Sequence, residues 1–446
     1  MQAHSDEPHG SSVSAVAGTS IPAHAGSATI GRQAWLALAV LSSLNLLNYA
    51  DRFVVSSLLP TLQKPVEQGG LALTDAESGW LYSAFILVYT ATAPIFGLLA
   101  DRVHRLHMLA FAVAFWSVLT AAGAWAVGFW SLLLVRSVTG LGEAAYASVA
   151  PALLADEFAP RLRSRVMSIF NAAIPVGAAI GFIIGSTVGV IWGWKHAFLV
   201  AGGPGLLLAA LIYLLRDPPR GTMEDHAVAA HAPPTVAALF TTWANARWRR
   251  CTLGYAAQTA CFGSLGYWTP LYLEKSKGMG GAVGGSAFGV IVVVTGLLGT
   301  IAGGWWSDRW RRTRPSAHLR VCAVTSLLAA PAIVLVVLAQ QPWLVWSAVA
   351  VACLLLVMST GPVNAQLVDV LHPSERGTGM AIAILALHLL GDVPGVPLVG
   401  TIAGWKGMDV AFGMLAVFAL LAAAIWWWAA LREPNVERVA GSTPQA

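Results

Sequence analysis

Four charged side chains stand inside stretches of this sequence that are otherwise apolar. Asp51 and Arg52 are neighbours in one stretch, and Arg136 and Glu143 lie seven residues apart in another. A charged group in apolar surroundings is costly unless it is paired or hydrated. We therefore expect these four side chains to line a water-filled cavity and to share one task.

The residue types indicate proton binding together with anion binding. Desolvation favours the neutral form of a buried carboxyl group, and a nearby guanidinium favours its charged form. An arginine released by a protonated carboxyl suits a carboxylate or phosphate, because its planar group binds two oxygens and keeps its charge. Asp51, Glu143 and Arg136 are the predicted proton-coupling residues, and Arg136 and Glu143 are also predicted to bind substrate.

Arg52 is a weaker candidate for substrate binding, because neighbouring residues of a helix project about 100° apart. An Asp51–Arg136 pair is geometrically possible, since both residues lie about 10 to 13 Å from the same end of their helices. The alternative to a proton switch is a static ion pair that fixes one helix to another.

Composition places these residues in a membrane protein. The chain is 57% hydrophobic and 11% charged, and its mean hydropathy is +0.68. A span needs roughly 20 apolar residues and must be helical, because lipid satisfies no backbone groups. The predicted fold is all-α, with twelve transmembrane helices in two sets of six. They lie near 34–60, 76–100, 106–128, 130–157, 164–190, 196–215, 250–273, 285–306, 319–339, 343–370, 378–403 and 408–431.

The distribution of charge predicts orientation and domain limits. Most arginines fall in segments on one side of these spans, whereas all lysines fall on the other side. The positive-inside rule then places both termini in the cytoplasm, and a bacterial inner membrane is the expected location. The inner arginines explain the pI of 9.2 without a nucleic-acid partner. The predicted parts are a disordered tail (1–31), two bundles (32–216 and 248–432), a linker (217–247) and a second tail (433–446).

A charged motif occurs twice, about two hundred residues apart, each time after a long apolar segment. A duplicated pattern of this kind is typical of transporters whose two halves move against each other. We predict a cytoplasmic gate, and the alternative is charge that serves topology alone. The predicted gate residues are Gly97, Asp101, Arg102 and Arg105, their counterparts Gly304, Asp308, Arg309 and Arg312, and two possible partners, Asp156 and Asp369.

Several classes of function lack their residues. No lysine follows a glycine, so the phosphate-binding loop of ATPases is absent and an ion or substrate gradient must supply the energy. The histidines and cysteines lack metal-ligand spacing, and we expect neither a metal nor a cofactor. A membrane enzyme would need a nucleophile–base or metal cluster, which the sequence does not offer. A non-transporting receptor stays open as an alternative.

Further polar and aromatic residues are candidates for the cavity wall. They are Asn48, Gln258, Tyr267 and Asn364. An aromatic wall for an apolar ligand and ordinary helix packing explain the aromatic residues of the 250–273 span equally well. Glycines at a four-residue interval in the 164–190 span predict a close approach by another helix.

Several strings resemble the spinster family of lysolipid and sphingolipid transporters, within the major facilitator superfamily. They are Asn48-Tyr-Ala-Asp51-Arg52, Arg136-Ser-Val-Thr-Gly140-Leu-Gly-Glu143, Gly361-Pro-Val-Asn364, His388-Leu-Leu-Gly-Asp392 and Arg216-Asp-Pro-Pro-Arg-Gly221, together with the duplicated motif. The resemblance covers about residues 34–431.

The resemblance implies alternating access by two rocking bundles, with protons and an amphiphilic lipid as partners. It implies that Asp51, Arg136 and Glu143 couple protons and meet the head group, and that His388 and Asp392 line the second half of the cavity. A local hydrogen bond between these last two residues is the alternative. The 164–190 span lacks the Gly-Pro order of the antiporter motif, so antiport gains no support. A proton-coupled symporter of a small organic anion is the second candidate, and we expect a monomer.

Overall fold

The computed structural model describes residues 31–100, 102–219, 241–372 and 375–433. The tail 1–31 except for Gly31, most of the linker 217–247, the tail 433–446 beyond Glu433, and Asp101 lie outside the described residues. Within the described parts the secondary structure is helical, with no strand.

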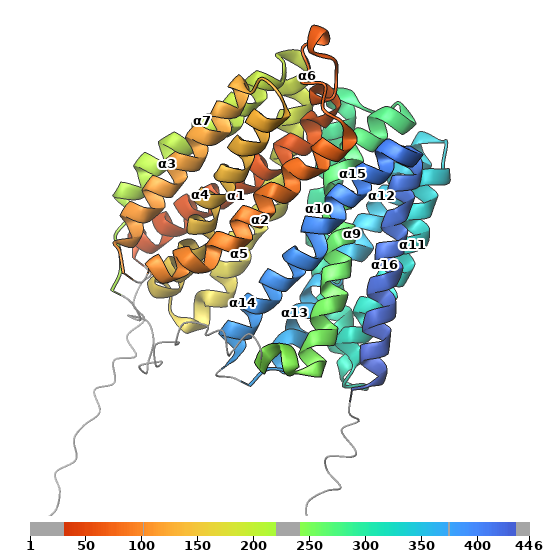
Figure 1. Ribbon diagram of the computed structural model, residues 1–446. Coiled ribbons are helices and arrows are strands. Elements are labelled where there is room, and N and C mark those ends of the chain that lie inside the picture. Colours follow the sequence, from red (N-terminus) through yellow and green to blue (C-terminus); the bar gives the residue numbers. More distant parts are fainter. Residues whose placement is uncertain (1–30, 101, 220–240, 373–374, 434–446) are drawn as a thin grey trace, which may run out of the picture.

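The described part of the chain contains twelve long helical segments, six in each half (Figure 1). Those of the first half are α1 (Arg32–Leu62), α2 (Asp75–Ala100), α3 (Arg105–Ala122), α4 (Phe129–Glu157), α5 (Pro160–Ile183) with its extension α6 (Gly189–Ile191), and α7 (Trp194–Leu211). Those of the second half are α9 (Ala246–Lys277), α10 (Gly281–Arg311), α11 (Ala317–Leu338), α12 (Pro342–Val357) with α13 (Thr360–Asp369), α14 (Arg376–Leu387) with α15 (Val393–Lys406), and α16 (Met408–Leu431). The predicted spans agree with these limits to within a few residues.

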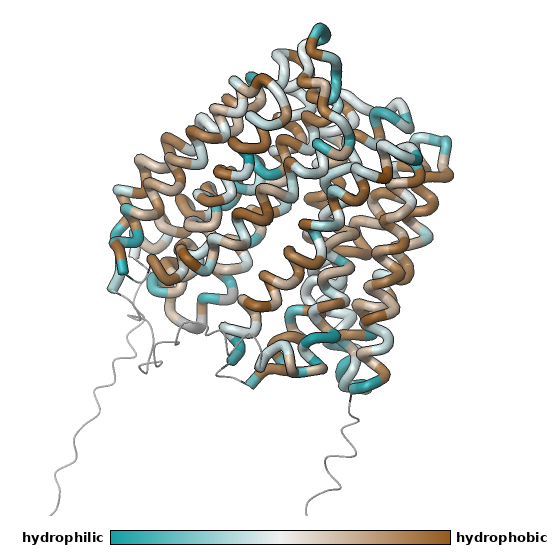
Figure 2. The backbone as a smooth tube through the Cα atoms, viewed as in Figure 1, coloured by the Kyte–Doolittle hydropathy of each residue, from teal (hydrophilic) through white to brown (hydrophobic). Residues whose placement is uncertain are grey.

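Ten of these segments are long and apolar enough to cross a membrane by themselves. The two that are not, among the described residues, are α1 and α9, the first helix of each half. Both are longer than 30 residues, and both carry charged or amide side chains in their interiors or at their ends. They contact each other across the two halves, so the least apolar helices lie at the centre. Figure 2 shows hydrophobic residues along the outer helices and hydrophilic ones gathered at the two ends.

The two halves repeat the same packing. In the first half α1 packs on α5, α2 on α4 and α3 on α7; in the second half α9 packs on the α14–α15 segment, α10 on α12 and α11 on α16. The helices that pair in one half are therefore the counterparts of those that pair in the other. A π-helical turn also interrupts the same helix of each half, at Ile184–Val188 and at His388–Asp392.

The halves meet near the end of the molecule that carries Lys64, Lys275 and Lys406, which we call the loop end. There α2 packs on α15, and α5 packs on α10. Glycine permits this approach, because a Cβ at Gly79 would stand 2.7 Å from the Cα of Pro397. Phe182 and Phe288 also meet across the halves, with ring centres 4.8 Å apart.

The opposite end, where the described chain begins and ends, is called the terminal end. All buried residues of α2 except Ala100 lie between Ser78 and Thr90, and the stretch 91–99 is partly or fully exposed, although Ser148 of α4 donates to the Ala93 carbonyl at 3.1 Å. The helix α14 packs chiefly on α9 and α13 of its own half. The described helix contacts between the halves therefore lie at the loop end and in the middle of the molecule, whereas α14 and the stretch 91–99 of α2 pack chiefly within their own halves.

The glycines of α5 set the distance between α5 and α1. A Cβ at Gly177 or Gly181 would overlap the carbonyl oxygens of Leu46 or Ala50, and one at Gly185 would overlap Ser57. The predicted close approach is therefore made to α1, backbone against backbone. Such contact fixes the height and rotation of α1, which carries Asp51 and Arg52.

We predict that Gly181→Ala lowers the stability of the folded protein by about 1–3 kcal/mol, the usual cost of overpacking. Thermal unfolding in detergent would measure it. The control is Gly413→Ala on α16, where a Cβ has no described atom within 4 Å and helix propensity should add about 1 kcal/mol of stability. If both variants unfold at the same temperature, the α1–α5 contact does not depend on glycine.

Candidate functional site

The first ion pair of the site joins α1 to α4 inside the first half. Arg136 Nη1 donates to Asp51 Oδ1 at 2.8 Å, and both side chains are buried, at 3% and 2% exposure. The second carboxylate oxygen, Asp51 Oδ2, accepts from Thr120 Oγ1 of α3 at 2.8 Å. Both oxygens of Asp51 are therefore occupied, and its charge is balanced by one guanidinium.

The second ion pair lies beside the first and reverses the arrangement of charge. Arg52 Nε of α1 donates to Glu143 Oε2 of α4 at 2.7 Å. Glu143 is fully buried, whereas the Arg52 side chain keeps 11% exposure. The other oxygen, Glu143 Oε1, is buried without a hydrogen-bond partner among the described residues.

Neighbouring charges on α1 thus meet two charges on α4 that are two helical turns apart. Adjacent residues of a helix project about 100° apart, and the Arg52 side chain is long enough to reach α4 in spite of this rotation. Arg52, the weaker candidate by sequence, is the more exposed of the two arginines and the nearer to open space. We call Asp51, Arg52, Arg136 and Glu143 the charge quartet; its formal charges sum to zero.

Aromatic rings surround the arginines of the quartet. The guanidinium of Arg52 lies over Tyr89 at 4.4 Å, Tyr49 at 5.0 Å and Phe85 at 5.3 Å from the ring centres. Phe85 is also 5.2 Å from the guanidinium of Arg136. Negative ring faces stabilise a cation that has few water molecules around it. These aromatic partners and Thr120 were not predicted, since aromatic and hydroxyl residues are too common in membrane helices to single out.

The second half contributes one charged pair, on the π-helical turn between α14 and α15. His388 Nδ1 and Asp392 Oδ2 are 2.7 Å apart. The imidazole is 20% exposed and the carboxyl group 3%. Asp392 Oδ1 is buried without a hydrogen-bond partner in the described structure. It fits there because residue 263 of α9 is a glycine, and a Cβ at this position would stand 2.5 Å from the oxygen. Ser83 of α2 donates to the Asp392 carbonyl at 3.4 Å, so this turn touches the first half.

The remaining predicted binding residues are mostly bonded to backbone. Gln258 donates to the Leu356 carbonyl at 3.0 Å and Asn364 to the Thr360 carbonyl at 2.8 Å. Tyr267 donates to the Ser78 carbonyl of the other half at 2.6 Å, so it lies in the loop-end contact. Asn48 is buried, and its Nδ2 has no partner among the described residues, which leaves it the freest of these polar groups.

Charges at the terminal end form networks within each half. Arg105 of α3 bonds Asp156 of α4 at 2.5 Å and also Asp217, with Nη2 2.6 Å from Oδ1. In the second half Asp369 lies 2.7 Å from Arg311, which also meets His318 at 2.7 Å.

Both networks connect helices of a single half, so the described pairs do not latch one half to the other. Asp217, Arg311 and His318 were not predicted. In the repeated motif Arg312 corresponds to Arg105, but it is the preceding residue, Arg311, that pairs with Asp369. Gly97 and Gly304 have no described atom within 4 Å of a Cβ position. Asp101 lies outside the described residues, and the other predicted gate residues are exposed: Arg102, Asp308, Arg309 and Arg312.

Comparison with known proteins gives a consistent result. The family model of the Major Facilitator Superfamily matches residues 41–391. Protein spinster homolog 1 of Bos taurus is 37% identical over 411 residues, which are 86% of this chain and 76% of that protein. The Homo sapiens protein of the same name is 37% identical over 397 residues, 83% and 73% of the two chains.

Two solved structures share the fold. One is the crystal structure of a bacterial homolog to the human lysosomal transporter Spinster, in an inward-facing and unoccupied conformation, with a TM-score of 0.80, 21% identity, and coverage of 90% of this chain and 97% of that one. The other is an inward-facing and occupied conformation, with a TM-score of 0.75, 20% identity, and coverage of 89% and 96%. The predicted fold class is confirmed.

Removal of one partner from the Asp51–Arg136 pair should destabilise the protein far more than removal of both. Arg136→Met leaves Asp51 buried and unpaired, which costs about 3–5 kcal/mol. The double variant Asp51→Leu/Arg136→Met removes both charges of the pair, and it should recover most of the lost stability. Thermal unfolding in detergent measures both variants, with the exposed Arg309→Met as control. Equal unfolding temperatures for the single and double variants would mean that the pair is not buried.

Proposed function

Because this chain belongs to the spinster family of the major facilitator superfamily, we propose that it is a proton-coupled secondary transporter of lysophospholipid-like or sphingolipid-like amphiphiles. Family membership makes it a multi-pass membrane protein and a transporter with the alternating-access fold, in a family of transporters rather than enzymes. The charge quartet is the observation that carries the proposal, since nothing else in the described core pairs so many charges.

Proton coupling would act through the two carboxylates of the quartet. A proton on Glu143 removes the charge that holds Arg52, and Arg52 then has only aromatic rings as partners. A proton on Asp51 would release Arg136 in the same way, although Arg136 is more deeply buried. Protonation therefore replaces an internal ion pair by a free guanidinium, which is an attractive partner for an anion.

The substrate class follows from where the charges and the apolar surface lie. Arg52 and Arg136 suit a phosphate or carboxylate head group, because a guanidinium binds two oxygens at once. The surrounding helices are apolar, which suits a hydrocarbon tail. His388 and Asp392 would meet the head group from the second half, and Asn48 would add a hydrogen bond. A proton-coupled symporter of a small organic anion is the alternative, because it needs the same arginines but no tail.

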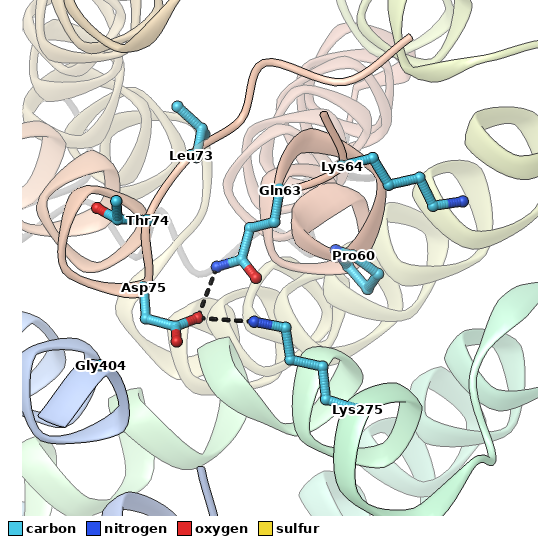
Figure 3. Close-up of a pocket in the computed structure, with 8 residues that line it drawn as sticks. All are labelled: Pro60, Gln63, Lys64, Leu73, Thr74, Asp75, Lys275 and Gly404. Atoms are coloured by element: carbon cyan, nitrogen blue, oxygen red, sulfur yellow. Dashed lines mark hydrogen bonds and ion pairs between the residues drawn. The ribbon is translucent and has the colours of Figure 1, made fainter. Parts of the chain in front are cut away.

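Alternating access would require the loop end to open. There Asp75 Oδ1 of α2 accepts from Lys275 Nζ of α9 at 3.0 Å and from Nε2 of Gln63, which directly follows α1, at 2.8 Å (Figure 3). Ser56 Oγ donates to the Tyr267 carbonyl at 2.6 Å, which adds another bond between the halves. We infer that these contacts form the seal that separates when the cavity faces the other side.

The terminal end would then close, with the duplicated motif as its gate. The two bundles, 32–216 and 248–432, would rock as units joined by the linker 217–247. The abundance of arginine at this end favours a cytoplasmic location for it and for both termini, in a bacterial inner membrane. We propose that the protein works as a monomer.

Flux into liposomes with an imposed pH gradient tests the proposal. Asp51→Asn, Arg136→Ala and Glu143→Gln should each reduce gradient-driven uptake of a lysolipid by at least about tenfold, since each removes about 1.4 kcal/mol or more of the proposed interaction. The control is Glu67→Gln in an exposed turn at the loop end. Parental rates in all three variants would refute proton coupling by the quartet. Competition by sugar acids but not by amphiphiles would favour the alternative substrate class.

Weakening the loop-end seal should shift the molecule toward the state open at that end. The Lys275 and Asp75 side chains are 43% and 17% exposed, so their ion pair contributes at most about 1 kcal/mol. Asp75→Asn should therefore raise the loop-open population by up to about fivefold. Distances between spin labels at the loop ends of α2 and α9 measure this population. The control is Lys406→Ala, an exposed residue at the same end; an unchanged distribution in Asp75→Asn would show that the pair is not part of the seal.

A further inference from the structure

Three consecutive tryptophans near the end of α16 divide between the protein interior and its surface. Trp426 is fully buried and donates from Nε1 to the Cys251 carbonyl at 3.1 Å. Trp427 and Trp428 are 45% and 46% exposed. They lie on the outer face of a membrane helix within one or two turns of its terminal end, at the depth where indole rings favour the lipid interface.

Arginines from three helices gather on these two exposed rings. The guanidiniums of Arg250 and Arg432 lie 5.1 and 4.7 Å from the centre of the Trp428 ring, and that of Arg320 lies 5.9 Å from the Trp427 ring. Arg250 comes from the first turns of α9, Arg320 from the start of α11, and Arg432 directly follows α16. The helices α9 and α11 both pack on α16, and the three cations therefore lie around the terminal end of α16, next to two consecutive tryptophans.

This surface has cations without matching acids. The nearest acid in the sequence, Glu433, accepts from Arg247 with both carboxylate oxygens and also from Gln366. Within the described part of the chain, no carboxylate pairs with Arg250, Arg320 or Arg432. Arg320 Nε donates to Ser316 Oγ at 2.9 Å, which orients its guanidinium.

We propose that Arg250, Arg320 and Arg432, held on Trp427 and Trp428, bind the phosphate of an anionic phospholipid at the terminal end. Basic groups between membrane helices at the headgroup level bind lipid phosphate in this way, each contributing about 1 kcal/mol. The rings beneath the cations face the hydrocarbon, so acyl chains can run along α16 while the head group meets the arginines. A membrane lipid fits this geometry, because a soluble phosphate would leave the exposed indoles uncovered.

The site is separate from the charge quartet. Its residues lie on the outer surface of the second half, whereas the quartet lies inside the first half. A lipid bound here would hold the terminal ends of α9, α11 and α16 together, so it should stabilise the second half whatever the transported substrate is.

Thermal unfolding of the whole chain in detergent, with added phosphatidylglycerol or phosphatidylcholine, tests the site. A ligand that binds only the folded state raises the unfolding temperature with its concentration. Phosphatidylglycerol should raise it more than phosphatidylcholine does. Arg250→Ala/Arg432→Ala should weaken the apparent affinity for phosphatidylglycerol about thirtyfold, because two arginines near the surface contribute about 1 kcal/mol each.

The matched control is Arg376→Ala, which removes an exposed arginine from the terminal end of the same half and should keep the parental affinity. Trp428→Leu keeps an apolar side chain but removes the ring under two arginines, and should weaken the affinity about fivefold; it serves if the double variant does not fold. Equal stabilisation by both lipids, or parental affinity in the arginine and tryptophan variants, overturns the proposal. So does inorganic phosphate, if it reproduces the effect of phosphatidylglycerol at the same concentration.

Discussion

Charges buried between membrane helices must be balanced within the protein, because lipid offers them neither water nor counterions. The charge quartet meets this constraint with an acid and a base on α1 facing a base and an acid on α4. Each carboxylate has one guanidinium, and the aromatic rings around Arg52 and Arg136 replace part of the lost hydration. A single added proton breaks this balance, and the structure has to respond because the remaining charge is costly where it stands.

The surroundings of the quartet fit that response. The glycines of α5 let the backbones of α5 and α1 touch, and this contact fixes the position of Asp51 and Arg52. Their charged partners lie on another helix, α4. The halves are joined at the loop end by helix packing, by hydrogen bonds and by one partly exposed ion pair. Contacts of this kind are individually weak. An imbalance of charge worth a few kcal/mol in the core is therefore of the right size to shift the seal.

The sequence predicted the helices well because length and apolarity by themselves define ten of the twelve long segments, all except α1 and α9. It also placed Asp51 within reach of Arg136, since helix rise fixes the depth of both residues. It did not predict the Arg52–Glu143 pair, because rotation about a helix axis cannot tell which way a long arginine side chain turns. Asp217 and Arg311 were missed for a related reason: a repeated motif fixes where charges gather, but it does not fix which nearby charge a flexible side chain pairs with. Neither π-helical turn has a signature in the residue types.

Those two turns carry a mechanical consequence. A π-helical turn contains one residue more than the regular helix requires, and its hydrogen bonds are weaker. Both turns touch the opposite half: Ile184–Val188 contacts α10, and His388–Asp392 contacts α2. The turn at His388–Asp392 lies near the middle of its helical segment, residues 376–406, whereas the turn at Ile184–Val188 lies near the loop end of the segment 160–191. A change of helix angle at either turn would therefore act directly on the contact between the two bundles, while each bundle otherwise rocks as a unit.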